Sequence, residues 1–107
     1  MTTNFIIIST TFNSLQKAQE ISLALLSSKL AGCTQIQNIG SSYVYNQQIC
    51  IEDEFLLTIK TKTSLFSSVE NYLIKHHPYQ VPQIIATTIS HISAQYAKWL
   101  ESCLLDD

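Results

Sequence analysis

The segment ICIEDEFLLTIK, residues 49–60, carries the strongest structural signal in the chain. Its apolar residues recur at every second position, whereas polar or small side chains occupy most of the positions between them. A period of two is typical of a β-strand that buries one face. The segment predicts a half-buried strand whose inner face carries Ile49, Ile51, Phe55, Leu57 and Ile59.

The preceding segment, CTQIQNIGSSYVYN at residues 33–46, is also rich in Ile, Tyr, Val and Thr. Residues 33–62 together predict one long β-hairpin that turns near Asn46 to Gln48. The glycine that favours the tightest hairpin turns is absent from this turn. Gly40 interrupts the first strand, where it predicts a bulge or a bend.

Two elements are expected before the hairpin. The run NFIIIST at residues 4–10 is apolar on both faces, which is typical of a central strand covered on both sides or lying at a subunit contact. Apolar residues at helical spacing then predict a helix from about Ser14 to Leu30. Asn13 is the predicted cap of this helix.

Three more elements are expected after the hairpin. Thr63 can cap a second helix, which should end near His76 or His77 because the next residue is proline. The run QIIATTIS at residues 83–90 predicts another strand of the buried type. Ser93 then opens a last amphipathic helix.

The predicted order of elements is β-α-β-β-α-β-α. Its first six members match the split βαβ arrangement, in which two helices pack on one face of a four-stranded antiparallel sheet. A chain of 107 residues is too short for two domains that each bury a core. We therefore expect one α+β domain over residues 1–107, a ferredoxin-like sandwich with an extra C-terminal helix.

The charge pattern excludes several classes of partner. Charged residues make up 13% of the chain, about half the usual share. All six basic residues are Lys, so no guanidinium group is present to grip a phosphate at two points. A net charge of −2 with scattered lysines also lacks the basic stripe that binds nucleic acid. We expect neither a nucleic-acid partner nor arginine-dependent phosphoryl chemistry.

Location is predicted from the apolar runs and the cysteines. No apolar run approaches the roughly 20 residues that cross a bilayer, and the first residues do not resemble a signal peptide. Three cysteines form an odd set without a Cys-x-x-Cys pair. This favours free thiols in a reducing compartment, so we expect a cytoplasmic protein without a membrane partner.

The segment HHPYQVP, residues 76–82, is the densest cluster of candidate site residues. Imidazole is the commonest protein ligand of transition metals. Adjacent residues on a helix point about 100° apart, however, so His76 and His77 are not expected to chelate one ion as a local pair. The alternative is a rigid connection between helix and strand, in which two prolines constrain the backbone and Tyr79 packs. Both interpretations stay open.

Cys33 is the candidate thiol. It directly follows Gly32 at a junction between helix and strand, where the absence of a side chain on Gly32 could leave the thiol accessible. Cys103 lies on the inner stripe of the last helix and is expected to act as a small buried apolar residue. A thiolate together with an imidazole suits copper(I) or zinc, although the spacing shows no tetrahedral set.

Glu52, Asp53 and Glu54 form an acidic run in which the two glutamates share one strand face and Asp53 takes the other. Paired carboxylates could serve acid–base catalysis. An exposed acidic patch is the alternative that we favour. The tyrosines are expected in the core or at an interface, and no nucleophile elbow or glycine-rich phosphate loop is present. We therefore expect a protein that is not an enzyme.

Four segments match one known family in order and spacing. They are KLAGC at 29–33, GSSYVY at 40–45, EFLLTIKT at 54–61 and HHPYQVPQII at 76–85. With these segments the chain resembles the CutA divalent-cation tolerance family over nearly its whole length, as far as the closing Tyr96 and Trp99.

The resemblance implies a ferredoxin-like homotrimer in which long hairpin strands pair across subunits, as in the PII signalling proteins. It also implies a cytoplasmic protein linked to tolerance of copper and other divalent metals, with no established enzymatic activity. The metal ligands that it implies are Cys33 and His77. Two departures bear on that site, because Ser9 replaces a cysteine found in some members and Gln83 replaces a glutamate. A third departure is the hairpin tip at residues 45–48, which lacks the usual glycine turn.

Two functional hypotheses follow. The first is a trimeric protein that binds copper or another divalent cation through Cys33 and His77 at or near a subunit cleft. The second is a PII-like signalling or interaction module whose clefts hold a small ligand or a protein partner. The absence of arginine argues against a nucleotide as that ligand.

Overall fold

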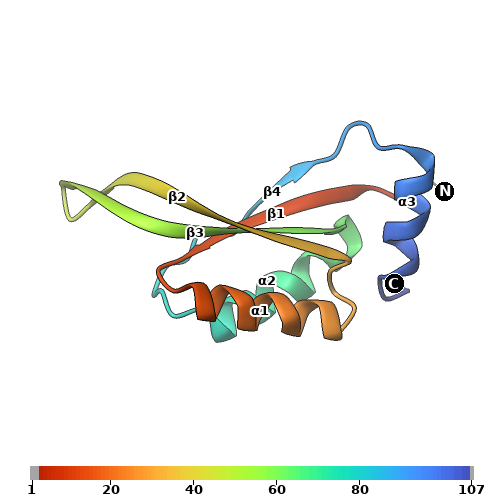
Figure 1. Ribbon diagram of the computed structural model, residues 1–107, viewed down its shortest axis with the longest axis horizontal. Coiled ribbons are helices and arrows are strands. Elements are labelled where there is room, and N and C mark those ends of the chain that lie inside the picture. Colours follow the sequence, from red (N-terminus) through yellow and green to blue (C-terminus); the bar gives the residue numbers. More distant parts are fainter. Residues whose placement is uncertain (1–2, 107) are drawn as a thin grey trace.

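Four antiparallel strands form one sheet in the order β2-β3-β1-β4, and helices α1 and α2 cover one of its faces (Figure 1). This computed structural model describes residues 3–106. It confirms the α+β, ferredoxin-like architecture predicted from the sequence. The bounds are β1 Phe5–Phe12, α1 Leu15–Ser27, β2 Cys33–Tyr45, β3 Gln48–Lys62, α2 Phe66–His76, β4 Ile85–Thr88 and α3 Ala94–Ser102.

The predicted hairpin is confirmed as β2 and β3. Their register runs without interruption from Cys33 opposite Lys60 to Tyr45 opposite Gln48. Asn46 and Gln47 form the turn with φ angles of 50° and 65°, so two non-glycine residues adopt the positive φ of a type I′ turn. Of the bulge or bend expected at Gly40, the bulge does not form, because Gly40 pairs with Asp53 in the same continuous ladder.

The main core lies between the sheet and the two helices. The helix-facing residues of β1 and β3 and the inner stripes of α1 and α2 are almost fully buried, as the alternating and helical patterns predict. The largest fully buried members are Ile8, Phe12, Ile21, Leu25, Leu57, Ile59, Val69 and Leu73.

Two predicted helix caps are corrected by the structure. Ser14, and not Asn13, caps α1 by accepting a hydrogen bond from the Lys17 amide at 3.2 Å. Thr63 does not cap α2, because its hydroxyl donates to the Asn4 carbonyl at 3.2 Å. A short 3₁₀ turn, Thr63–Leu65, leads into α2 instead. The end of α2 at His76 is as predicted.

Helix α1 ends at Ser27, three residues before the predicted limit. Lys29 adopts a φ of 62°, which turns the chain out of the helix toward β2. Gly32 then passes close to α3: a Cβ atom at this position would lie 2.5 Å from Leu100 Cδ1 and 3.3 Å from Cys103 Cβ. A side chain at residue 32 would therefore push α3 away.

Helix α3 is capped by Ser93, as predicted, through a 3.3 Å hydrogen bond from the Tyr96 amide. It packs at the end of the sheet opposite the hairpin tip (Figure 1). There Leu100 and Leu104 form a second buried cluster with Phe5 and Leu65.

Strand β4 differs from its prediction. It spans only four residues, and all four side chains are exposed, whereas the sequence predicted a buried strand over residues 83–90. The reason is its place at the sheet edge, where β1 is its sole partner within residues 3–106. Within the same residues, no helix is both long and apolar enough to span a membrane.

The hairpin extends well beyond the rest of the sheet (Figure 1). Strand β1 ends at Phe12 opposite Phe55, so no third strand of residues 3–106 lies beside the hairpin beyond that point. The protrusion gives the molecule its length of 47 Å against widths of 25 and 21 Å. Ile49 and Ile51 are 79% and 78% exposed, so the predicted burial of odd positions in this strand holds only from Phe55 onward.

Candidate functional site

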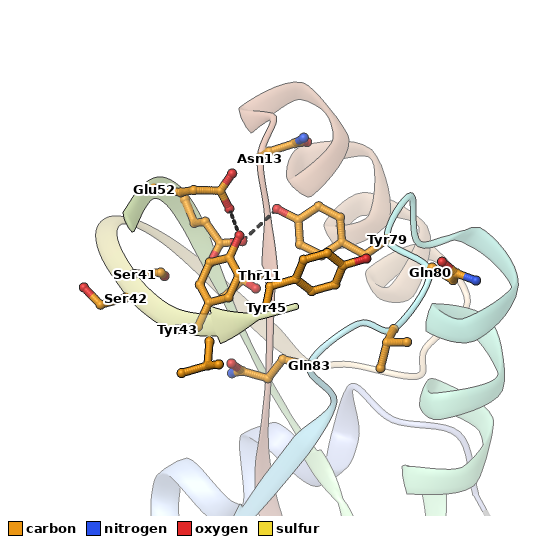
Figure 2. Close-up of a pocket in the computed structure, with 13 residues that line it drawn as sticks. Thr11, Asn13, Ser41, Ser42, Tyr43, Tyr45, Glu52, Tyr79, Gln80 and Gln83 are labelled. Carbon is orange, nitrogen blue, oxygen red and sulfur yellow. Dashed lines mark hydrogen bonds between the residues drawn. The ribbon is translucent and has the colours of Figure 1, made fainter. Parts of the chain in front are cut away.

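A cavity of about 800 Å³ lies at the base of the protruding hairpin (Figure 2). It forms just beyond the end of β1, where the β2–β3 ribbon meets the loop that connects α2 to β4. Most of the residues that line it carry a hydroxyl, amide, phenol or carboxylate group, and no lysine or histidine of the described part of the chain is among them. Six of the lining side chains are Tyr43, Tyr45, Glu52, Glu54, Tyr79 and Gln83.

Two tyrosine–glutamate pairs organise the cavity. The Tyr79 hydroxyl donates to Glu54 Oε2 at 2.7 Å, which ties the loop after α2 to strand β3. The Tyr43 hydroxyl donates to Glu52 Oε1, diagonally across the hairpin. Figure 2 shows the hydroxyl groups of Tyr43 and Tyr79 pointing toward the same carboxylate-bearing region. The cavity therefore holds two phenol donors and two carboxylate acceptors close together.

The titration of the two phenols reflects these contacts. The hydrogen bond from the Tyr43 hydroxyl to Glu52 raises the pKa of Tyr43 to about 12. Burial raises the pKa of Tyr79, and the hydrogen bond to Glu54 and the charges of both glutamates raise it further. Both phenols thus stay protonated at neutral pH and remain hydrogen-bond donors.

The two glutamates differ in exposure although they share one strand face. Glu54 is only 6% exposed, whereas Glu52 is exposed. The sequence placed these two residues on one face and Asp53 on the other, and the structure confirms this. The favoured interpretation of the whole run as an exposed acidic patch is wrong for Glu54, which is covered by Tyr79.

His77 lies on the helix-covered side of the sheet. Its ring stacks on Phe12, with ring centroids 4.3 Å apart and planes at 13°. Nε2 lies 2.9 Å from the Thr11 carbonyl, which makes it the proton-bearing nitrogen, and Nδ1 accepts from the Tyr79 amide at 3.1 Å. Both ring nitrogens are thus engaged within the chain.

Burial lowers the pKa of His77, and this effect opposes the Thr11 carbonyl and the Glu54 charge, which raise it. The buried ring is therefore a neutral imidazole near neutral pH. The His76 ring packs against Tyr72 with ring centroids 4.2 Å apart, so the two imidazoles have different partners.

Cys33 and His77 are not brought together within one chain. Cys33 lies in a cross-strand row with Lys60 and Ile7, whereas His77 contacts Thr10, three residues farther along β1. Three residues of strand span about 10 Å, and an odd separation places the two rows on opposite faces of the sheet. One ion cannot contact both side chains of the same chain in this arrangement.

The three cysteines are free and partly buried. Cys103 is thus less buried than the sequence predicted, because it lies at the C-terminal end of α3. No group of three or more His, Cys, Asp or Glu side chains within residues 3–106 is placed to hold a metal ion.

The chain matches the family described as "CutA1 divalent ion tolerance protein" over residues 6–103, which span nearly all of the elements described above. The chain belongs to this family. The matched residues include the hairpin, the cavity and the His-His-Pro-Tyr segment.

Relatives of the family cover most of this chain. A probable divalent-cation tolerance protein cutA homolog of Encephalitozoon cuniculi is 36% identical over 99 residues, which cover 92% of this chain and 87% of that protein. The crystal structure of CutA1 from the psychrotrophic bacterium Shewanella sp. SIB1 superposes with a TM-score of 0.90 at 34% identity and covers 95% of this chain and 96% of that one.

A third relative is described as the periplasmic divalent cation tolerance protein CutA from Archaeoglobus fulgidus. Its structure has a TM-score of 0.90 at 29% identity and covers 92% of this chain and 97% of that one. The CutA1 family is named for tolerance of divalent ions and not for a catalytic activity.

Sequence reasoning missed the two tyrosine–glutamate pairs. The Tyr43–Glu52 pair could have been found, because a two-residue turn at 46–47 places these residues diagonally across the hairpin. The Tyr79–Glu54 pair carries no such local signal. It depends on how the loop after α2 crosses the end of β1, which is a tertiary contact between residues 25 positions apart.

Proposed function

We propose that this protein is a cytoplasmic, homotrimeric divalent-cation tolerance protein that binds copper or another divalent metal ion. The exposed apolar surface of the protruding hairpin is the observation that supports the proposed trimer. A two-stranded ribbon is marginally stable alone in water, and soluble monomers rarely expose a continuous apolar patch. The most exposed members are Val44 at 71%, Ile49 at 79% and Ile51 at 78%.

A complementary surface lies at the other edge of the sheet. Val81 is 88% exposed, Ile85 in β4 is 55% exposed, and β4 has a free edge within the described residues. A hairpin that pairs with this edge of the next copy makes a head-to-tail contact, which closes into a ring if the rotation between copies fits. The resemblance to the CutA family, which implies a homotrimer, supports three copies in that ring.

Substitution of the hairpin tests the assembly. The double change Ile49→Ser and Ile51→Ser should convert the trimer to monomer, measured by native mass spectrometry at micromolar protein. Leu23→Ser is the matched control, because Leu23 is a 63% exposed apolar residue that lies on α1 and not on the hairpin. A monomeric wild type, or a double variant that stays trimeric, would contradict the proposed assembly.

Cys33 and His77 are the proposed metal donors. Because they occupy opposite faces within one chain, a shared ion would need Cys33 of one subunit and His77 of another. His77 would also have to release the Tyr79 amide from Nδ1 before it could coordinate. A thiolate and an imidazole suit copper(I), which accepts soft ligands at low coordination number.

Equilibrium dialysis of the reduced trimer against copper(I) tests these donors. The Cys33→Ser, His77→Ala double variant should lose stoichiometric binding, whereas Cys103→Ser should retain it. Equal binding by the double variant and the wild type would show that the ligands lie elsewhere.

The cytoplasmic location is supported by three free thiols, which suit a reducing compartment. The Archaeoglobus fulgidus relative is named periplasmic, so the location is worth testing directly. Fractionation of the source cells should place this protein with the cytosolic markers, and recovery with periplasmic or secreted markers would contradict the proposal.

The cavity favours a second function, a PII-like signalling or interaction module. In this alternative the clefts between subunits hold a small ligand or a protein partner, and the metal response is indirect. The cavity supports it because ligand sites are concave, mostly pre-formed and equipped with a few convergent polar groups. A copurified small molecule without stoichiometric metal, seen by native mass spectrometry, would favour this alternative.

A further inference from the structure

The cavity at the hairpin base has an unusual charge balance. Among residues 3–106, two ion pairs form, Lys17–Glu20 and Lys62–Glu101, and neither involves a cavity glutamate. No basic side chain of these described residues lines the cavity. Glu52 and Glu54 therefore place two carboxylates in one concave site without a counter-charge from the described part of the chain.

Glu54 is the more informative of the two carboxylates. It is 94% removed from solvent, since its exposed fraction is 6%. Within residues 3–106, its carboxylate receives one hydrogen bond, from the Tyr79 hydroxyl to Oε2, which leaves Oε1 without a donor. Within the described residues, Glu101 Oε2 is the one buried side-chain oxygen without a hydrogen-bond partner, so Glu54 Oε1 is open to the cavity and is free to contact a bound cation.

Aromatic rings form the rest of the surroundings. Tyr43, Tyr45 and Tyr79 all line the cavity, and Figure 2 shows their rings close to one another in this view. The face of a phenol ring attracts a cation within about 6 Å of its centre, most strongly an organic ammonium ion that sheds water easily. Carboxylates beside aromatic faces, with no basic residue, form the recognition chemistry of an ammonium group.

A divalent metal ion fits the same site less well. Calcium takes six to eight oxygen ligands and magnesium keeps several of its waters, so two carboxylates that each already accept a tyrosine hydrogen bond form a poor site for either ion. No cluster of three ligating His, Cys, Asp or Glu side chains occurs in the described part of the chain, at this cavity or elsewhere. The cavity volume also favours an organic ligand over a metal ion, because about 800 Å³ suits a small organic molecule.

We propose that this cavity binds a small organic cation, with its ammonium group beside Glu52 and Glu54 and its carbon atoms against the faces of Tyr43, Tyr45 and Tyr79. The amide of Gln83 and the neighbouring hydroxyls hydrogen-bond any polar group at the other end of the ligand. This inference rests on the second proposed function and names its class of ligand. Val44 and Val81 line the same cavity and belong to the proposed subunit contact, so a second copy would close the site.

Choline and its neutral isostere dimethylbutanol test the charge requirement, because carbon replaces the ammonium nitrogen and the shape is kept. The assay is a titration of the full-length trimer by ligand-observed NMR. Choline should bind saturably, and the neutral isostere should bind at least about tenfold more weakly, as the loss of one charge-assisted contact predicts.

Three variants locate the binding. Glu52→Gln and Glu54→Gln should each weaken choline binding by about tenfold. Glu52 is exposed, so its substitution tests the site even where the Glu54 variant fails to fold. Asp53→Asn is the matched control, because it removes the same charge from the same strand on the opposite face, and it should bind choline like the wild type.

Four results would overturn the inference: no saturable choline binding, equal binding of choline and dimethylbutanol, an equal loss in Asp53→Asn, or displacement of choline by stoichiometric zinc. Native mass spectra of the same samples separate this failure from failure of the assembly. A trimer without choline refutes the cation site alone, whereas a monomer that binds choline refutes the assembly alone.

Discussion

The two halves of β3 have the same alternating pattern and opposite surroundings. In the half that pairs with β1, Leu57 and Ile59 are fully buried under the helices. In the half that pairs only with β2, Ile49 and Ile51 are exposed by more than three quarters. A period of two thus specifies which residues share a face, but not whether anything covers that face.

This contrast separates two kinds of stabilising contact. The body of the molecule is held by apolar burial within the chain, which is effective at any protein concentration. The hairpin leaves its apolar surface exposed in the single chain, and any stabilisation from the proposed contact with another copy depends on concentration. The cavity lies at the boundary between the two regions, where β1 ends and Tyr79 crosses to Glu54.

The largest expected effect comes from one matched pair of truncations on β3. Leu57→Ala should lower the free energy of unfolding by about 2–5 kcal/mol, because it leaves a cavity in the core. Ile51→Ala should instead change the dependence of the unfolding midpoint on protein concentration. Urea unfolding at two protein concentrations checks both results. If the two variants behave alike at both concentrations, the distinction between body and hairpin is wrong.

The two glycines offer a second pair of substitutions, which should affect the free energy of unfolding differently. Gly32→Ala should cost about 1–3 kcal/mol, because its Cβ would lie 2.5 Å from Leu100 Cδ1 and Leu100 is fully buried. Gly40→Ala meets no atom within 4 Å and should be neutral or stabilise by up to about 1 kcal/mol. Thermal or urea unfolding measures both changes. A destabilised Gly40 variant would show that the space beside Gly40 in the hairpin is filled and not open.

The third prediction concerns the pH dependence of the free energy of unfolding, which should come from the buried residue His77 in the body of the molecule. Burial lowers its folded pKa below the ordinary value of 6.5, so the unfolded chain binds a proton that the folded chain excludes. The free energy of unfolding should therefore fall as pH drops below about 6.5, until the folded pKa is reached. Urea unfolding between about pH 8 and pH 5 measures this slope.

The control for this titration is His91, which is exposed. His77→Gln should flatten the slope, and His91→Gln should leave it as in the wild type. An unchanged slope in His77→Gln would show that His77 takes up its proton equally in the folded and unfolded chains.

The smallest effect is expected in the hairpin. The hydrogen bond to Glu52 raises the pKa of Tyr43 to about 12, so Glu52→Gln should return that pKa toward 10.0. Stability should scarcely change, because Tyr43 and Glu52 are both exposed. NMR titration of the tyrosine rings gives the pKa. Asp53→Asn is again the control, and an equal shift in that variant would assign the effect to general charge and not to the hydrogen bond.

Four local features were predictable from the sequence because their causes lie within a few residues, although the caps predicted at Asn13 and Thr63 were wrong. The alternation at residues 49–60, the turn at 46–47, the cap at Ser93 and the end of α2 before Pro78 all depend on local backbone preferences. The family resemblance also rests on sequence, since its four segments lie within the matched residues 6–103.

Other features depend on which segments pack together, and no local pattern encodes that. Strand β4 is exposed because it lies at an edge, and Glu54 is buried because a distant loop carries Tyr79 over it. Cys33 and His77 lie on opposite faces of the sheet, and this placement follows from the register of three paired strands, which no local pattern specifies. Periodicity specifies a face of each element, whereas burial and proximity arise when separate elements meet.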